Sequence, residues 1–287
     1  MQQVVIGMKP MDVDGLAVYD YGDGDAVLLM PYSHSFTTSS MAEGRLANLL
    51  AANHRLITFD PPGAYRSTRR PRMDVAEMID CAVEALGAME LDGPVDVVGH
   101  SAGAFCATAF AATNPERVNR LALVAPAGVG DPSKLTALPF GPTDRRFWRF
   151  YRNAIPVYLG MGNAEQHKAV YDVLVPALHA DPAKCPEFVA DPRGRHAPAP
   201  RRATILRGVP ELGPDALAAI RVPTLLVAGS RDPIVPLSLA EKVAAWIPQA
   251  DLVVFEDCGH YPQHEAPEQL HDVLAGFLNW RVTRCTP

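Results

Sequence analysis

The chain has 287 residues, of which 48% are hydrophobic and 20% charged, a balance typical of a soluble globular protein. Its 26 basic and 32 acidic residues give a net charge of −6 with no long basic block, which argues against nucleic acid as a partner. No run approaches the roughly 18 apolar residues that span a bilayer, and the first residues lack the pattern of a signal peptide. Five scattered cysteines without a Cys-x-x-Cys pair indicate neither a zinc site nor a disulfide framework. We therefore expect a cytoplasmic protein without a membrane partner.

Short apolar runs rich in branched side chains predict buried strands. In chain order these runs are Leu16–Tyr19, Ala26–Met30, Leu56–Phe59, Val95–Val98, Leu121–Ala125, Thr224–Ala228 and Leu252–Phe255. From Leu56 onwards most of them are separated by segments of helical period such as Val75–Leu86, where Asp74 and Glu77 resemble a capping box. This alternation predicts an α/β fold with a mostly parallel sheet. The first strands are too close together for crossover helices, so we expect them to pair antiparallel.

The alternation of strands and helices stops between about Asp131 and Pro214, where prolines accumulate. Within this stretch, Asp144–Ile155 mixes aromatic residues with four arginines and predicts a helix. The arginines could hold an anionic substrate or lie on a solvated helix face, and we favour the second interpretation. We expect a core over residues 1–130, a helical insertion over 131–212 and the rest of the core over 213–287.

The most informative motif is Gly99-His100-Ser101-Ala102-Gly103. It directly follows a predicted strand and precedes a helix of small residues over Ala102–Thr113, which is the context that gives Gly-x-Ser-x-Gly its meaning. A sharp strand-to-helix turn would strain Ser101 and expose its hydroxyl at the end of the sheet. The five residues alone are only moderately specific, because a glycine-rich turn with an incidental serine has the same pattern.

A serine nucleophile needs a base, and the base needs an acid to orient it. Asp232 and His260 each lie in a loop just past a predicted strand, where parallel sheets place their sites. The order Ser, Asp, His predicts a catalytic triad of Ser101, Asp232 and His260. Asp131 also follows a predicted strand and is the alternative acid. The remaining histidines have no metal-ligand spacing, so we expect no metal.

Three further segments match motifs of one superfamily: Phe59–Ser67, Asn114–Val118 and Gly259–Glu268. Together with the serine motif, they make the chain resemble the α/β-hydrolase superfamily, specifically its cap-bearing esterases, proline iminopeptidases and C–C hydrolases. The resemblance implies an α/β-hydrolase fold with about eight strands, helices on both faces of the sheet and a helical cap over 131–212. The motif His-Gly-Gly-Pro-Gly is absent, which argues against proline iminopeptidase activity. The serine at the nucleophile position separates the chain from haloalkane dehalogenases and epoxide hydrolases.

The loop after the strand ending at Met30 departs from the family pattern. The family register would make the backbone amides of Ser33 and Ala102 the two oxyanion donors, but Tyr32 replaces the usual glycine. His34 could donate to a substrate carbonyl or could order this loop, and we favour the second interpretation. The candidate substrate-binding residues are Tyr32, His34, Trp148 and Tyr151.

These residues predict a cofactor-free serine hydrolase that forms an acyl-enzyme. The expected partner is a small, mostly apolar carbonyl compound with an ester, lactone, amide or activated C–C bond, of which we favour the carboxylic ester. A homodimer is left open. The same groups serve acyl transfer, perhydrolysis and lyase chemistry. The alternative function is therefore a non-hydrolytic catalyst or a ligand-binding sensor, which the altered loop at Pro31–Ser35 motivates.

Overall fold

The predicted apolar runs form one sheet in the computed structural model, which describes residues 9–31, 44–70, 72, 74–158, 163–188 and 212–279. Within those residues the sheet has eight strands in the order β1-β2-β4-β3-β5-β6-β7-β8. They are β1 (Met11–Val13), β2 (Leu16–Tyr21), β3 (Ala26–Met30), β4 (Arg55–Phe59), β5 (Val95–His100), β6 (Val118–Val124), β7 (Thr224–Gly229) and β8 (Ala250–Phe255). From β4 across to β8 every neighbouring pair is parallel, which confirms the expected mostly parallel sheet.

The pairing of the first strands differs from the expectation. β2 is antiparallel to β1 and to β4. The prediction is wrong for β3, which is parallel to both β4 and β5 and does not adjoin β2. The side chains from Val27 to Met30 are completely buried, so this strand needs a neighbour on each edge and a helical layer on each face. The three-residue strand β1, which is largely exposed, was not predicted.

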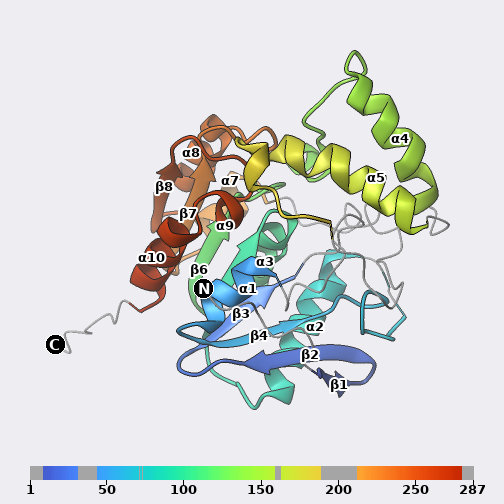
Figure 1. The fold of residues 1–287 in the computed structure, drawn as a ribbon. Coiled ribbons are helices and arrows are strands. Elements are labelled where there is room, and N and C mark those ends of the chain that lie inside the picture. The colour runs from blue at the N-terminus through green and yellow to red at the C-terminus, as the bar shows by residue number, and fades with distance from the viewer. Residues whose placement is uncertain are drawn as a thin grey trace.

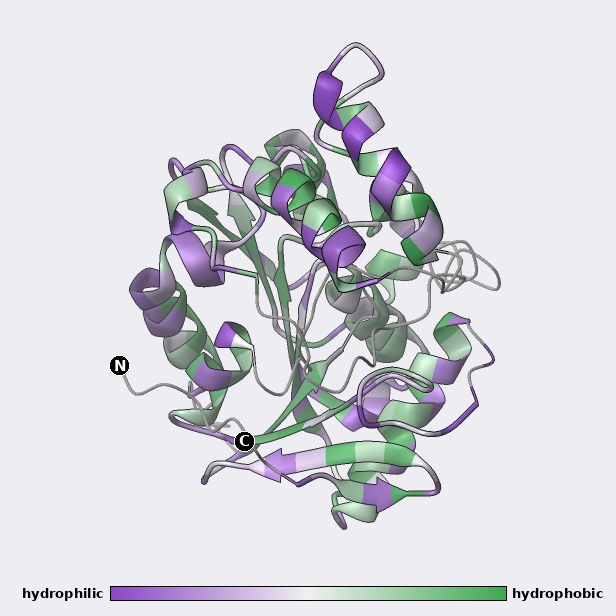
Figure 2. Ribbon diagram, turned by 45° about the vertical axis from the view of Figure 1, so that its right-hand side comes forward, coloured by the Kyte–Doolittle hydropathy of each residue, from purple (hydrophilic) through white to green (hydrophobic). Residues whose placement is uncertain are grey.

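Helices cover both faces of the sheet, as Figure 2 shows. They are α1 (Arg45–Ala51), α2 (Val75–Ala88), α3 (Ala102–Thr113), α7 (Pro214–Ala218), α8 (Leu237–Trp246), α9 (Pro262–Glu265) and α10 (Pro267–Leu278). Alternate residues of β3 contribute to two separate cores. Leu28 and Met30 pack with α2, α3, α7 and α8, whereas Val27 and Leu29 pack with α1 and α10.

The helix α2 begins where the sequence predicts. The Asp74 carboxylate accepts a hydrogen bond of 2.7 Å from the backbone N–H of Glu77. The Glu77 carboxylate in turn accepts from the backbone N–H of Arg72, two residues before the N-cap. The first bond is the one that the predicted capping box requires of Asp74, whereas the second satisfies the N–H of Arg72, which lies before the helix.

A second group of helices follows β6: η3 (Pro132–Thr136), α4 (Arg145–Tyr158), α5 (Ala164–Leu174), η4 (Pro176–Leu178) and η5 (Pro182–Lys184). Figure 1 shows α4 and α5 side by side, outside the layers formed by the sheet and its covering helices. Their own core includes Phe150, Ala154 and Val170 and extends to Val235 and Tyr261, in the loops after β7 and β8. Among the described residues, no helix is long and apolar enough to cross a membrane.

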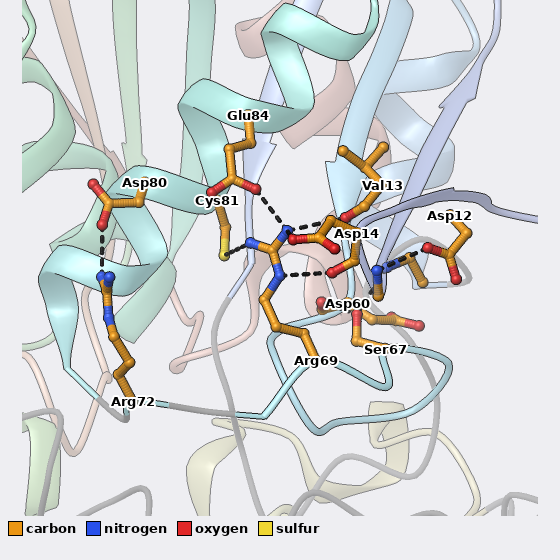
Figure 3. Close-up of polar contacts among 12 residues, drawn as sticks. Asp12, Val13, Asp14, Asp60, Ser67, Arg69, Arg72, Asp80, Cys81 and Glu84 are labelled. Atoms are coloured by element: carbon orange, nitrogen blue, oxygen red, sulfur yellow. Dashed lines mark hydrogen bonds and ion pairs between the residues drawn. The ribbon is translucent and has the colours of Figure 1, made fainter.

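Arg69 attaches the turn between β1 and β2 to helix α2 (Figure 3). Its guanidinium donates to the carbonyls of Asp14 and Val13, each at 3.0 Å, and forms a 2.7 Å ion pair with Glu84. The Glu84 carboxylate raises the pKa of Arg69 above its usual value. These bonds fix the edge of the sheet, where a short strand has few other contacts.

We expect Arg69→Met to lower the free energy of unfolding by about 1–3 kcal/mol, because it leaves two backbone carbonyls without their charged donor. Urea denaturation measures this difference. Arg72→Met is the matched control, because the Arg72 side chain is 57% exposed and its ion pairs with Asp80 and Asp74 lie at the surface. The control should stay within about 0.5 kcal/mol of the wild type. Equal effects of the two substitutions would contradict the assigned role of Arg69.

Candidate active site

Ser101 occupies the sharp turn between β5 and α3. Its backbone has φ 55° and ψ −123°, a left-handed conformation that a residue with a side chain rarely adopts. The backbone N–H of Ser101 donates to the carbonyl of Val124 on β6, at 2.9 Å, and its carbonyl accepts from the N–H of Ala104 and Phe105 at the start of the helix. The strained strand-to-helix turn predicted for this motif is therefore present.

The turn needs glycine at position 99 because two backbone segments meet there. A Cβ atom on Gly99 would lie 2.4 Å from the carbonyl oxygen of Gly103 and 2.6 Å from the Cα atom of Ala104. Both contacts are with backbone atoms of α3, which cannot move aside without displacing the helix. The glycine thus allows the helix to start close against the end of β5.

We expect Gly99→Ala to destabilise the protein by about 3 kcal/mol, because the added methyl group overlaps backbone atoms. Thermal and urea unfolding of the purified variant measure the loss. Gly276→Ala is the matched control: apart from its chain neighbours and the backbone of α10, none of the described residues has an atom within 4 Å of the added methyl group. This control should stabilise the protein by about 0.5–1 kcal/mol through helix propensity. A Gly99→Ala protein as stable as the wild type would show that the turn can relax.

The structure brings the three predicted triad residues together. The Ser101 hydroxyl lies 2.8 Å from Nε2 of His260, and Nδ1 of the same ring lies 2.7 Å from Oδ2 of Asp232. Because a carboxylate only accepts, Nδ1 carries the hydrogen and Nε2 is the acceptor for the serine proton. All three residues are less than 10% exposed, so solvent competes little with these hydrogen bonds.

Asp232 is held by backbone groups on the side away from the histidine. Its Oδ1 atom accepts from the N–H of Ile234 at 2.7 Å and of Val235 at 3.0 Å. The carboxylate orientation is therefore set by the loop after β7. The alternative acid, Asp131, accepts instead from the backbone and hydroxyl of Ser133 at the start of η3. Asp232 is thus the carboxylate that contacts the His260 ring.

His100 supports the backbone of His260. Its Nε2 atom donates to the His260 carbonyl at 2.8 Å, and its ring is 1% exposed. Burial and the neighbouring His260 lower the pKa of His100 to about 3, so the ring is neutral near pH 7. His100 thus has a structural role beside the nucleophile.

Neither cysteine near the triad has the properties of a nucleophile. Cys106 lies on α3 and packs in the core, and Cys258 lies two residues before His260. Burial raises the pKa of both thiols to about 12. Both therefore stay protonated, whereas the reactive form of cysteine is the thiolate.

Ala102 is the first residue of α3, directly after Ser101. The first N–H groups of a helix have no partner within the helix, and they favour negative charge. The position of Ala102 thus suits the expected oxyanion donor. The second expected oxyanion donor, Ser33, lies outside the described residues, as do the candidate substrate-binding residues Tyr32 and His34.

Trp148 and Tyr151 lie on the exposed side of α4. Trp148 is 63% exposed and its indole N–H donates to the carbonyl of Pro142, while Tyr151 is 37% exposed and contacts the Phe147 ring. Their role in substrate binding stays a prediction. The four arginines of this helix are also exposed, in agreement with the favoured solvated face.

Comparisons with known proteins agree with this architecture. The sequence profile of the alpha/beta hydrolase family matches residues 27–273. A 2-hydroxy-6-oxononadienedioate/2-hydroxy-6-oxononatrienedioate hydrolase of Pseudomonas putida is 29% identical over 90% of both chains. A 2-hydroxymuconate semialdehyde hydrolase of Pseudomonas sp. (strain CF600) is 33% identical over 80% of this chain and 78% of that protein. Among solved structures, an alpha/beta fold family hydrolase from Bacillus anthracis matches with a TM-score of 0.72 and 16% identity, covering 92% of this chain and 94% of that one.

Proposed function

The chain belongs to the alpha/beta hydrolase family, and from this premise we propose that it is a cofactor-free serine hydrolase of small, mostly apolar carbonyl compounds. The observation that carries the proposal is the hydrogen-bonded series Ser101–His260–Asp232, with distances of 2.8 and 2.7 Å. A protein that only binds a ligand has no need for such an arrangement. This argues against the alternative of a sensor.

In the proposed mechanism, Ser101 attacks the substrate carbonyl while Nε2 of His260 takes the hydroxyl proton. Asp232 holds the ring in the required tautomer and stabilises the imidazolium that forms. His260 then gives its proton to the leaving group, and a water molecule activated by the same ring releases the acyl group. The amides of Ala102 and Ser33 are the proposed oxyanion donors.

For the bond that is cleaved, we propose an activated C–C bond first and a carboxylic ester second. The two relatives described above are named as hydrolases of 2-hydroxy-6-oxononadienedioate/2-hydroxy-6-oxononatrienedioate and of 2-hydroxymuconate semialdehyde. The same serine chemistry serves esters, because both substrates present a carbonyl carbon to the nucleophile. We further propose that residues 131–212 form the cap over the core of 1–130 and 213–287, and that Trp148 and Tyr151 belong to the part that selects the substrate.

Labelling with a fluorophosphonate, followed by peptide mapping, tests the nucleophile. We expect modification of the peptide that contains Ser101, because Nε2 of His260 is placed to accept the hydroxyl proton. Turnover of a ring-fission 2-hydroxy-6-oxo-dienoate and of 4-nitrophenyl acetate then compares the two bond classes, with a higher kcat/KM expected for the dienoate. Folded protein that takes up no label would favour the sensor. Turnover of the ester alone would favour a carboxylic ester over a C–C bond as the bond that is cleaved.

A further inference from the structure

Glu265, at the end of α9, joins two segments of the chain that lie far apart in sequence. Its Oε1 atom accepts from the backbone N–H of Gly259 at 2.8 Å, and its Oε2 atom accepts from the backbone N–H of Asp181 at 3.0 Å. Gly259 immediately precedes His260, and Asp181 lies after α5, in the helical region between β6 and β7. The carboxylate is 6% exposed, so these two bonds form in a largely dry environment.

Two more hydrogen bonds join the same segments. The backbone N–H of His260 donates to the carbonyl of Leu178 at 2.8 Å. The ammonium group of Lys184 donates to the backbone carbonyl of Glu265, also at 2.8 Å. The N–H of His260 is therefore held by the segment 178–184, while its carbonyl is held by His100 from the core.

The segments also pack closely. A Cβ atom on Gly259 would lie 2.6 Å from both the backbone N of Ala180 and the carbonyl oxygen of Leu178. Beside this contact, the rings of His179 and His264 lie 3.0 Å apart between nitrogen atoms. Little space is left for the His260 loop to move relative to the segment 178–184.

We propose that Glu265 is a positioning residue, which aligns the imidazole of His260 with Ser101 by bonding the loop before His260 to the segment 178–184. The inference rests on the proposed function, in which His260 is the base. The 2.8 Å contact between Nε2 and the serine oxygen depends on the backbone position of His260, and a misplacement of about 1 Å can cost about 10²-fold in rate. Because 178–184 lies within the proposed cap, the same bonds connect the cap to the base.

Glu265→Gln tests the proposal with almost no change in shape. The carboxylate accepts one N–H on each oxygen, whereas an amide has one accepting oxygen and one donating nitrogen. In the variant, the backbone N–H of either Gly259 or Asp181 faces an N–H₂ donor. The two segments that carry these residues must then move apart. Glu256→Gln is the matched control, because Glu256 is an exposed residue of the same loop.

We expect Glu265→Gln to lower kcat by about 10- to 100-fold with KM changed less than about threefold, and to slow fluorophosphonate labelling by a similar factor. Amide hydrogen exchange should accelerate in peptides that contain Gly259 and Asp181. Glu256→Gln should match the wild type in every measurement. A variant with a lower melting temperature but an unchanged kcat would overturn the proposal, since Glu265 would then be structural only.

Two further results keep the proposal separable from its premise. If the wild type shows neither turnover nor labelling, the proposed function fails. The role of Glu265 in holding the loop is then tested by amide hydrogen exchange alone, and unchanged exchange in Glu265→Gln would reject it. If Glu265→Gln does not fold, Lys184→Met replaces it as the test. This substitution of an exposed residue removes the bond from Lys184 to the Glu265 carbonyl, one of the four bonds between the segments. We expect this variant to lower kcat about two- to fivefold and to accelerate the same exchange. If both kcat and the exchange rate of this variant equal those of the wild type, the proposal is overturned.

Discussion

Replacing Ser101 with alanine is expected to lower kcat by about 10⁴- to 10⁶-fold and to leave the fold intact. The substitution removes the only atom of the side chain that reaches His260, at 2.8 Å, and with it the proposed covalent step. Alanine must adopt the same φ of 55°, so the backbone strain of the turn is unchanged. Steady-state turnover of the preferred substrate and a thermal melt by circular dichroism measure the two expectations.

Ser238→Ala provides the control for the loss of a serine hydroxyl. Ser238 is an exposed residue of α8, and its substitution should change neither turnover nor melting temperature measurably. If Ser101→Ala keeps more than a few per cent of the wild-type activity, Ser101 is not the nucleophile. The hydrogen-bonded series would then need another explanation.

Asp232→Asn is expected to lower kcat by about 10³- to 10⁴-fold while the protein stays folded. The Oδ1 atom of Asp232 accepts from two backbone N–H groups, so the single oxygen of asparagine is retained on that side. The amide N–H₂ then points at Nδ1 of His260, which must become an acceptor. The ring hydrogen moves to Nε2, and the ring can no longer accept the proton of Ser101.

Asp257→Asn is the control for removal of one carboxylate charge in the same region. Asp257 is 77% exposed and pairs with Arg231 on the surface, and an asparagine tolerates its φ of 55°. Its turnover should equal that of the wild type. A rate for Asp232→Asn within tenfold of the wild type would mean that the tautomer of His260 is not set by Asp232.

The turn at Ser101 could be predicted because its requirements are local. A buried strand, a glycine where a helix approaches closely, and a run of small helix-forming residues lie within about twenty positions of each other. The observed helix α3 covers Ala102–Thr113, the range expected from the sequence. The start of α2 at Asp74 was predictable for the same reason, since an N-cap bonds a group only three residues away.

Both partners of Ser101 were predicted from the sequence, but an alternative stayed open for the acid. Asp232 and His260 could be placed at the ends of strands from the positions of two apolar runs, but Asp131 satisfied the same condition. The order of strands across the sheet, and the backbone N–H groups that hold Asp232, decided which carboxylate meets the ring. Glu265 had a weaker signal: it stood in the motif Gly259–Glu268, without any indication that it reaches Asp181.

The amino-acid sequence by itself therefore determined seven of the eight strands in the described residues, the start of α2, the range of α3, the serine turn and the order of the triad residues. These features depend on hydrophobic periodicity and on turn chemistry, which act over a few neighbouring residues. Only the tertiary structure decided that β4 lies between β2 and β3, and that the segment 178–184 holds the loop of His260. The bond between Asp181 and Glu265 joins residues 84 positions apart, and many pairings of distant segments satisfy the same local pattern. The burial of the whole core selects one of them.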